Sequence, residues 1–199
     1  MNDPRPNAVM WIEPQPVQVP DAIWPLAGGN RLVAETLVRL GLKSIAAATA
    51  FLYPEHYTPA PPTDLPDLAK AADRLELAFQ RGERIGVWGD FDVDGQTSTT
   101  LLVAVLRGLG AQVDYHIPVR AVESHGVKVE RLQEFLDSGV QLVLTCDTGV
   151  TAHDAAAFCR QRGVDMIITD HHSLPPELPD AYAVVNPQRL PERHPLRTL

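Results

Sequence analysis

Cysteine is scarce in this chain of 199 residues, long apolar runs are missing, and basic residues are outnumbered by acidic ones. With only Cys146 and Cys159, the sequence cannot build a disulfide framework, and their separation does not resemble a zinc ribbon. We expect both to be small buried residues without a redox role. No apolar stretch is long enough to cross a bilayer, which argues against a membrane protein.

The shortage of basic residues bears on possible partners. Lys and Arg number 17 against 25 Asp and Glu, so the formal net charge is -8 at pH 7. Because proteins that bind nucleic acid are usually basic, this balance weakens that hypothesis. A site that binds metal ions gathers carboxylates, however, and bound cations reverse the local field. The overall charge therefore decides neither for nor against a nucleic-acid substrate.

The first part of the chain is expected to be an accessory region. Prolines cluster between residues 4 and 20, which predicts an extended leader rather than a signal sequence, and hence a cytoplasmic protein. Residues 30–50 space their apolar side chains as short amphipathic helices do. The prolines of residues 53–66 predict a linker, after which residues 67–82 return to helical spacing. We therefore place a helical, proline-rich N-terminal region at residues 1–82.

From residue 83 onward, predicted strands and helices alternate. The apolar runs that predict strands cover residues 85–88, 113–117, 142–145, 165–169 and 182–185. The helical stretches between the first four of them cover residues 97–109, 128–138 and 152–162. This alternation predicts an α/β fold over residues 83–199, with a Rossmann-like parallel sheet flanked by helices. In such folds ligands bind at the carboxyl ends of the strands.

Acidic and histidine residues follow three of these predicted strands. They are Asp90, Asp92, Asp94, Asp147, Asp170, His171 and His172. Carboxylate oxygens and imidazole nitrogens bind divalent ions, and imidazole suits manganese, zinc or iron better than magnesium. Two metal ions side by side usually hydrolyse phosphate esters. The sequence therefore predicts metal-dependent phosphoester hydrolysis at this edge of the sheet.

The acidic motif alone leaves two interpretations open. Gly95 permits a sharp turn after Asp94, and the next helix would then present backbone N–H groups and the hydroxyls of Thr97 and Ser98 to a phosphate. A calcium-like acidic loop or a solvated turn explains the motif equally well. Asp147 alone is more often an ordinary turn or helix-capping residue. Only the succession of three motifs at strand ends favours a catalytic site.

Together the three motifs resemble those of the DHH phosphoesterase family, which includes pyrophosphatases, nanoRNases, cyclic-dinucleotide phosphodiesterases and the RecJ exonucleases. Further segments resemble the RecJ pattern in the right order. They are residues 51–54, 84–90, 117–120 and 184–187. The likeness runs from about Ala46 to the end of the chain. It implies a single-strand-specific 5′ to 3′ DNA exonuclease that releases 5′-mononucleotides in DNA repair and recombination.

The resemblance also implies a catalytic set. The metal ligands would be Asp90, Asp92, Asp94, Asp147 and His171. They would hold two divalent ions, with manganese expected before magnesium and Asp147 as a bridge between them. His172 would contact the scissile phosphate or support the site. Trp88 stands where many members of the family have a histidine, which puts one ligand in doubt.

Substrate contacts are implied for four other residues. Arg120 resembles an arginine that meets a DNA phosphate, and its alternative is a surface salt bridge. Thr97 and Ser98 are candidates at the start of the helix after the acidic motif. His125 is a candidate in a segment, Ser124-His125-Gly126, that departs from the glycine-aromatic-glycine pattern of RecJ.

Single-stranded DNA is thus the expected partner, with a helicase and a single-strand-binding protein as candidate protein partners and no membrane. Two alternatives remain: a DHH hydrolase of short oligoribonucleotides or cyclic dinucleotides, and a catalytically silent DHH protein that acts as a replication scaffold. The family pattern also needs a further aspartate downstream, which is not visible before Leu199. We therefore expect a domain truncated at its C-terminus and weakly active or inactive by itself.

Overall fold

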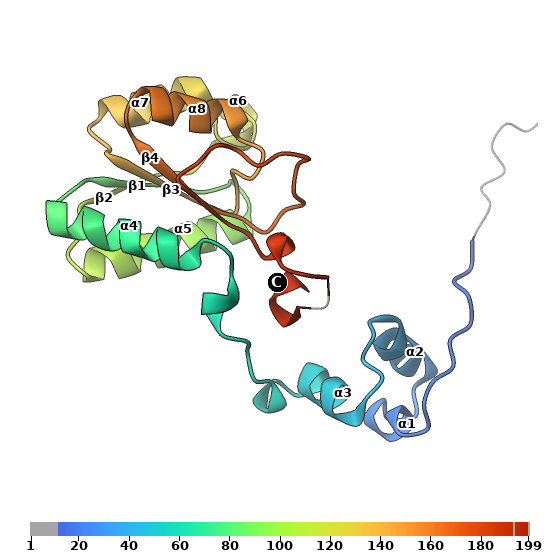
Figure 1. The fold of residues 1–199 in the computed structure, drawn as a ribbon. Helices are drawn as coiled ribbons and strands as arrows, with labels where there is room; N and C mark the ends of the chain where they lie inside the picture. Colours follow the sequence, from blue (N-terminus) through green and yellow to red (C-terminus); the bar gives the residue numbers. More distant parts are fainter. Residues whose placement is uncertain (1–11, 193, 199) are drawn as a thin grey trace, which may run out of the picture. The chain divides into compact units, whose positions relative to one another are not determined.

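The protein consists of two compact units in a computed structural model that describes residues 12–192 and 194–198 (Figure 1). The units divide between Pro59 and Ala60. Residues 4–11 of the predicted proline-rich leader lie outside the described part. No helix in the described ranges combines the length and the hydrophobicity that a membrane crossing requires.

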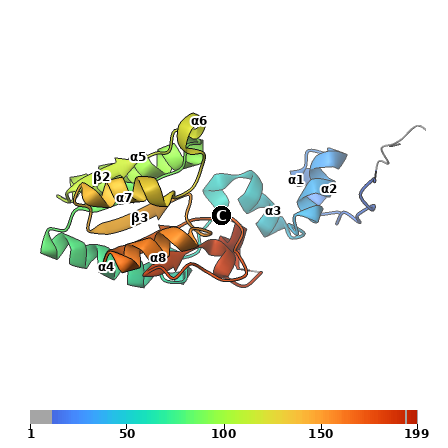
Figure 2. The ribbon, with the colours of Figure 1, turned by 90° about the horizontal axis from the view of Figure 1, so that it is seen from above.

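Three short helices form the first unit (Figure 2). They are α1 (Ile23–Leu26), α2 (Arg31–Arg39) and α3 (Ile45–Leu52). Asn30 caps α2, since its side chain accepts hydrogen bonds from two backbone N–H groups, and Ser44 caps α3 by accepting one from the Ala47 N–H. Ile23, Leu37 and Ala48 meet in a small core. The short helices predicted over residues 30–50 are therefore present, as α2 and α3.

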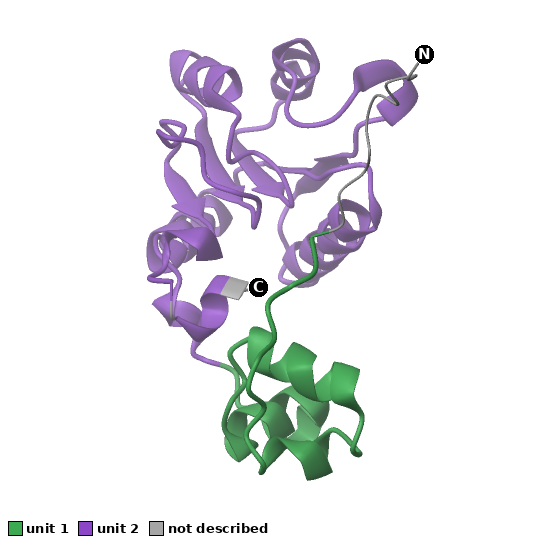
Figure 3. Ribbon diagram, turned by 90° about the vertical axis from the view of Figure 1, so that its right-hand side faces the viewer, with its two compact units in different colours: residues 1–59 green, residues 60–199 purple. Residues whose placement is uncertain are grey.

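The prolines that follow α3 prevent the chain from continuing as an α-helix, as the sequence predicts. Only two 3-10 turns form in this segment, η1 (Pro54–His56) and η2 (Pro62–Asp64). Figure 3 shows the two units in separate colours. The boundary between them falls between η1 and η2.

The second unit is built on a five-stranded sheet in which every pair of neighbours is parallel. The strands are β1 (Ile85–Trp88), β2 (Val113–His116), β3 (Leu142–Cys146), β4 (Asp165–Thr169) and β5 (Ala183–Val185). Their spatial order is β2-β1-β3-β4-β5. The chain passes from β1 to β2 and returns to the other side of β1 with β3, so the order reverses between β1 and β3. Open parallel sheets bind ligands outside such a reversal.

Helices cover both faces of the sheet (Figure 1). One face packs against α4 (Leu68–Arg81) and α5 (Val93–Gly108), and the other packs against α7 (Val129–Asp137) and α8 (His153–Gln161). A short helix, α6 (Arg120–Glu123), lies in the connection from β2 to α7. Val87 and Leu144 face the first pair of helices, whereas Trp88, Val143 and Ile168 face the second pair. The central strands are therefore apolar on both sides, which confirms the predicted helix-flanked parallel sheet.

Helix α4 packs on the sheet, although we expected it to end the accessory region at residue 82. Ala71 and Ala78 lie in the core of the second unit. The Arg74 side chain, which is 7% exposed, forms ion pairs with Glu83 at 2.7 Å and with Asp165 at 2.6 Å. The second unit thus begins some twenty residues before the predicted boundary, because the apolar face of α4 needs the sheet as its partner.

Helix α5 begins at Val93, four residues earlier than predicted. The Asp92 side chain caps it, since Oδ1 accepts a hydrogen bond from the Gly95 N–H at 3.0 Å. The predicted sharp turn at Gly95 is wrong, because Gly95 lies in the first helical turn and is buried. A Cβ on Gly95 would lie 2.4 Å from the Asp90 carbonyl oxygen. Glycine is therefore needed for a close approach of helix to loop.

This close approach predicts opposite effects for two glycines of one helix. Gly95→Ala should lower the free energy of unfolding by about 1–3 kcal/mol, because the new methyl group would overlap the Asp90 backbone. Gly108→Ala should be neutral or stabilise by about 0.4–1 kcal/mol, because nothing lies within 4 Å of its Cβ position. Urea unfolding followed by circular dichroism measures both. Equal effects of the two substitutions would contradict the role of Gly95.

Candidate metal centre

Three loops at the carboxyl ends of neighbouring strands bring the predicted site residues together. The loop after β1 carries Asp90 and Asp92, and the loop after β3 carries Asp147. The loop after β4 carries His171 and His172. Because β1, β3 and β4 are adjacent in the sheet, residues about eighty positions apart in the sequence become neighbours in space.

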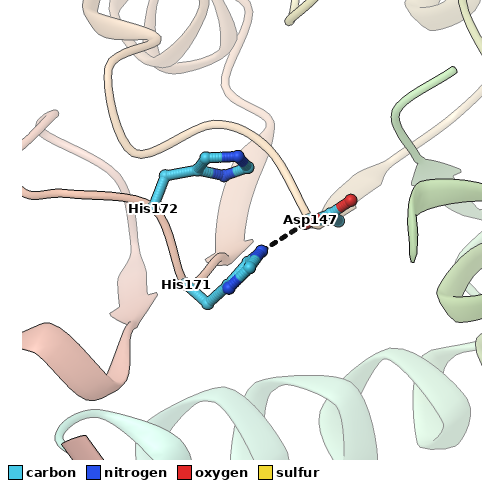
Figure 4. A group of neighbouring side chains, drawn as sticks. All are labelled: Asp147, His171 and His172. Carbon is cyan, nitrogen blue, oxygen red and sulfur yellow. Dashed lines mark ion pairs between the residues drawn. The ribbon is translucent and has the colours of Figure 1, made fainter. Parts of the chain in front are cut away.

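Asp147, His171 and His172 form the centre of the site (Figure 4). One donor atom from each lies within 4.8 Å of the others, and His171 Nε2 is 2.9 Å from Asp147 Oδ1. The Asp147 side chain is 7% exposed, whereas those of His171 and His172 are 48% and 56% exposed. A buried carboxylate beside two accessible imidazoles fits a divalent transition-metal ion better than calcium.

The backbone at Asp147 is strained. Its φ of 59° lies in the left-handed region, which residues other than glycine rarely adopt. The Asp147 N–H donates to the Thr169 carbonyl at 3.0 Å, and the Thr145 hydroxyl donates to the Thr148 carbonyl at 2.7 Å. These contacts hold the loop in place. Strain of this kind gathers at functional sites, where the surrounding structure keeps a side chain in a required position.

The electrostatics of Asp147 and Asp92 are linked. Burial raises the pKa of the Asp147 carboxyl, and the negative charge of Asp92 raises it further. The hydrogen bond from the Gly95 N–H holds the pKa of Asp92 below its usual value. Asp92 therefore stays ionised beside a carboxyl that is costly to ionise. A bound cation would relieve this repulsion.

The two other acidic residues of the first motif, Asp90 and Asp94, lie on either side of Asp92 in the sequence, in the loop after β1 and in the first turn of α5. Asp94 lines a cavity of about 490 Å³ together with Asp147 and His171. Asp90 Oδ1 accepts a hydrogen bond from the Phe91 N–H at 2.7 Å. The structure thus brings the predicted ligands to one edge of the sheet, and their assignment as ligands stays a prediction.

Asp170 is a residue of this site for which the sequence predicted no separate role. Its side chain is 1% exposed, and Oδ1 lies 2.7 Å from His172 Nδ1. The same oxygen accepts hydrogen bonds from the N–H groups of His171 and His172, at 2.7 and 3.1 Å. Its Oδ2 accepts from the Val150 N–H at 2.9 Å. Asp170 thus orients His172, raises its pKa and ties the loop after β4 to the loop after β3.

A signal for this role exists in the sequence. A carboxylate that directly precedes two histidines at the end of a buried strand can turn back to their N–H groups. The bond to Val150, twenty residues earlier, could not be foreseen, because it depends on the pairing of β3 with β4.

Thr97 and Ser98 lie beyond the start of α5. Because that helix begins at Val93, the expectation that they stand at its N-terminus is wrong. Their hydroxyls donate to backbone carbonyls, Thr97 to Val93 at 2.7 Å and Ser98 to Gly95 at 3.2 Å. Ser98 still lines the cavity beside Asp94. A phosphate contact for either residue stays a prediction.

The Arg120 guanidinium lies over the ring of Phe91, a residue of the acidic motif. Its guanidinium carbon is 4.4 Å from the centre of the Phe91 ring. The Phe91 carbonyl accepts a hydrogen bond from Gln96 Nε2 at 2.6 Å, which helps to fix this segment. Within the described residues Arg120 has no carboxylate partner, so the alternative of a surface salt bridge is not seen there. An aromatic partner leaves its charge and its hydrogen-bond donors available.

Two other residues lie away from this group. His125 lines a second cavity, beside the first turns of α7 and α8. Trp88 is fully buried, with its ring centre 4.2 Å from that of His116 and 5.7 Å from that of Phe135. In this chain Trp88 therefore packs the core on the α7 side of the sheet.

The two cysteines are buried and free, as predicted. Burial raises the pKa of both thiols, that of Cys159 to about 12. Each thiol is therefore protonated at neutral pH.

Comparison with known proteins assigns this arrangement to a family. The pattern described as "DHH family, N-terminal domain" matches residues 84–193, which is more than half of the chain. The chain belongs to the DHH family. The matched range includes all three loops of the metal centre.

Within this family the chain is similar to RecJ proteins. The single-stranded-DNA-specific exonuclease RecJ of Bacillus subtilis is 37% identical over 168 residues, which are 84% of this chain and 21% of the relative. The RecJ of Thermus thermophilus is 43% identical over 128 residues, which are 64% of this chain and 19% of the relative. The chain thus spans about a fifth of these curated relatives.

Solved RecJ structures share the fold. A crystal structure of exonuclease RecJ bound to manganese gives a TM-score of 0.64 at 40% identity, covering 68% of this chain and 35% of that chain. The structure of Thermus thermophilus RecJ in complex with Mn²⁺ gives a TM-score of 0.61 at 32% identity. The match covers 87% of this chain and 24% of that chain.

The contacts of Asp170 generate a prediction about pH. His172 has a raised pKa, so it contributes stability that is complete below its ordinary pKa of 6.5 and is lost as the pH rises through the folded value. Asp170→Asn should lower the pKa of His172 and destabilise the fold by about 1–3 kcal/mol, more below pH 6.5 than at pH 8. Histidine NMR titration and urea unfolding at two pH values measure these effects.

Asp73→Asn is the matched control, because Asp73 is an exposed acid on α4. It should leave the titration of His172 unchanged. An unchanged His172 titration in the Asp170 variant would contradict the assigned contact.

Proposed function

We propose that this chain carries the metal-binding part of a RecJ-like exonuclease, specific for single-stranded DNA. It would hydrolyse phosphodiester bonds by two-metal catalysis in the 5′ to 3′ direction and release 5′-mononucleotides in DNA repair and recombination. The observation that carries this proposal is the group of Asp147, His171 and His172 beside Asp92 at the carboxyl edge of the sheet. The names of the RecJ relatives and the manganese in solved RecJ structures support it.

The donor set fits divalent ions, and two are proposed, manganese before magnesium. Asp147 and His171 would hold them together with the acidic residues of the first motif, Asp90, Asp92 and Asp94. When bound, such ions supply Lewis-acid activation of water and of the phosphate group. Asp147 must be deprotonated to take part, so protons and cations compete for this carboxylate.

The other residues would bind and orient the substrate. Asp170 holds His172 through Nδ1, which leaves Nε2 as the ring nitrogen that can meet a phosphate oxygen. Arg120 would bind a DNA phosphate with donors that no described carboxylate occupies. Phe91 would support that guanidinium with the face of its ring. We also propose a cytoplasmic location and, as protein partners, a helicase and a single-strand-binding protein.

Loss of the metal ligands should abolish the activity. In the full-length protein, Asp147→Ala and His171→Ala should each reduce Mn²⁺-dependent degradation of single-stranded DNA by more than about 100-fold, because each removes a donor atom from the centre of the group. Nucleotide release and calorimetric titration with Mn²⁺ measure the two effects. Asp73→Ala and His56→Ala, which change exposed residues of the same types, should keep both properties.

Three results would count against this function. Degradation by the full-length protein that is equally fast in the parent and in the Asp147 and His171 variants would contradict the proposed metal centre. Faster hydrolysis of short oligoribonucleotides or cyclic dinucleotides than of long DNA would favour the other DHH hydrolases. A parent protein that binds no Mn²⁺ would favour a silent scaffold.

Arg120 and Phe91 predict a separate effect on binding. Arg120→Ala should raise KM for single-stranded DNA by about 10- to 100-fold and reduce the salt dependence of binding by about one unit, because a phosphate contact is lost. Phe91→Leu should have a smaller effect in the same direction, because it keeps an apolar side chain but removes the aromatic face. Arg81→Ala, on the exposed end of α4, is the control. A change in kcat alone would contradict a binding role.

A further inference from the structure

Asn186 is a buried polar residue beside the candidate metal centre. It directly follows β5, which pairs with β4, so it lies next to the loop that carries His171 and His172. Its exposure is 0%. A buried amide is costly unless its donor and its acceptor find partners. The partners of Asn186 therefore show what this residue holds in place.

Both ends of the Asn186 amide are bonded. Nδ2 donates to the His172 carbonyl at 3.0 Å, and Oδ1 accepts a hydrogen bond from the Gln188 N–H at 2.8 Å. These partners determine the orientation of the amide, because a carbonyl requires a donor and an N–H group requires an acceptor. Asn186 thus caps the 3-10 turn η3 (Pro187–Arg189) and at the same time ties the loop after β4 to the end of β5.

The bond to the His172 carbonyl replaces regular backbone pairing. Residues 173–182, which follow His172, contain no helix or strand, so a side chain supplies the partner of this carbonyl. Asp170 Oδ1 accepts a hydrogen bond from the His172 N–H at 3.1 Å and lies 2.7 Å from His172 Nδ1. Asp170 and Asn186 together hold the N–H, the carbonyl and one ring nitrogen of His172. This leaves Nε2 for a substrate or an ion.

The segment that carries Asn186 is itself well supported. Arg189 Nη1 donates to Asp67 Oδ2 at 2.7 Å, directly before α4. Arg197 Nη1 donates to the Gln188 carbonyl at 2.6 Å. Hydrogen bonds from charged donors are stronger than those between neutral groups. The end of β5 can therefore act as a fixed support for the loop after β4.

We propose that Asn186 is a positioning residue for the candidate metal centre, which holds the loop of His171 and His172 in its binding geometry through the His172 carbonyl. The proposal rests on the proposed function, in which His171 binds a metal ion and His172 meets the phosphate. The Asn186 bond goes to the main chain of the loop, so its effect on the ion passes through the loop. Residues that orient metal ligands in this way commonly change metal affinity or activity by about 10- to 100-fold.

Asn186→Ser separates the two contacts of the amide. Serine is a good capping residue, so its hydroxyl can still accept from the Gln188 N–H. Its side chain is too short to bring a donor to the His172 carbonyl. Asn186→Ala removes both contacts. A residue that only caps η3 predicts that serine behaves like the parent, whereas a positioning residue predicts that serine and alanine are impaired alike.

Metal affinity and local hydrogen exchange of the full-length protein measure the effect. Asn186→Ser and Asn186→Ala should each weaken Mn²⁺ binding by about 10- to 100-fold in calorimetric titration. In the metal-free protein, hydrogen exchange followed by mass spectrometry should become faster at residues 170–174 and stay unchanged at residues 142–146. Leu136→Ala is the control, because it removes a buried side chain of α7. It should lower the melting temperature at least as far and leave Mn²⁺ affinity unchanged.

Either of two results would overturn the proposal. If Asn186→Ser matches the parent in Mn²⁺ affinity and in exchange, Asn186 only caps η3. If Leu136→Ala loses as much Mn²⁺ affinity as Asn186→Ser, the loss follows from lower stability and not from the position of the loop.

Degradation assays separate this proposal from the proposed function. With oligothymidylate as substrate, Asn186→Ser should lower kcat by about 10- to 100-fold and leave KM nearly unchanged, because the proposed strand contact of Arg120 remains. An unchanged kcat would overturn the proposal. If the parent degrades no DNA, the proposed function fails, and the exchange of residues 170–174 still decides whether Asn186 holds the loop.

Discussion

The parallel pairing of β1, β3 and β4 is the constraint on which the rest of the structure depends. Parallel strands need helical crossovers, so helices cover both faces and the central strands are mostly apolar on both sides. The same pairing places three strand ends at one edge, with Trp88 opposite Thr145 and Cys146 opposite Thr169. The loops beyond those ends can therefore bring polar side chains from three strands together. The candidate metal centre lies there because the ends of β1, β3 and β4 adjoin.

Asp170 converts this alignment into a defined site. One buried carboxylate holds His172, receives the N–H groups of its own loop and reaches Val150 on the loop after β3. The nearby Asp147 has a strained backbone, and the pKa of its carboxyl is raised. Both features are unfavourable in the metal-free protein. A cation that binds the folded state would offset them, so metal binding and stability are coupled.

The loop after β3 also connects the two cavities. Asp147 faces the acidic motif and α5, while Thr148 lines the space between the starts of α7 and α8. The first cavity is lined by the carboxylates of Asp94 and Asp147, and the second is lined by both basic and acidic side chains, among them Lys128 and Glu130.

The sequence by itself determined the parallel α/β fold and the edge of the sheet at which the DHH motifs meet, because apolar periodicity and strand-end positions are local properties. Only the tertiary structure decided where α5 begins, since its start depends on the close approach of Gly95 to Asp90. It also decided that α4 belongs to the sheet, through burial of Arg74. The bond from Asp170 to Val150 likewise joins segments whose proximity exists only after the strands pair.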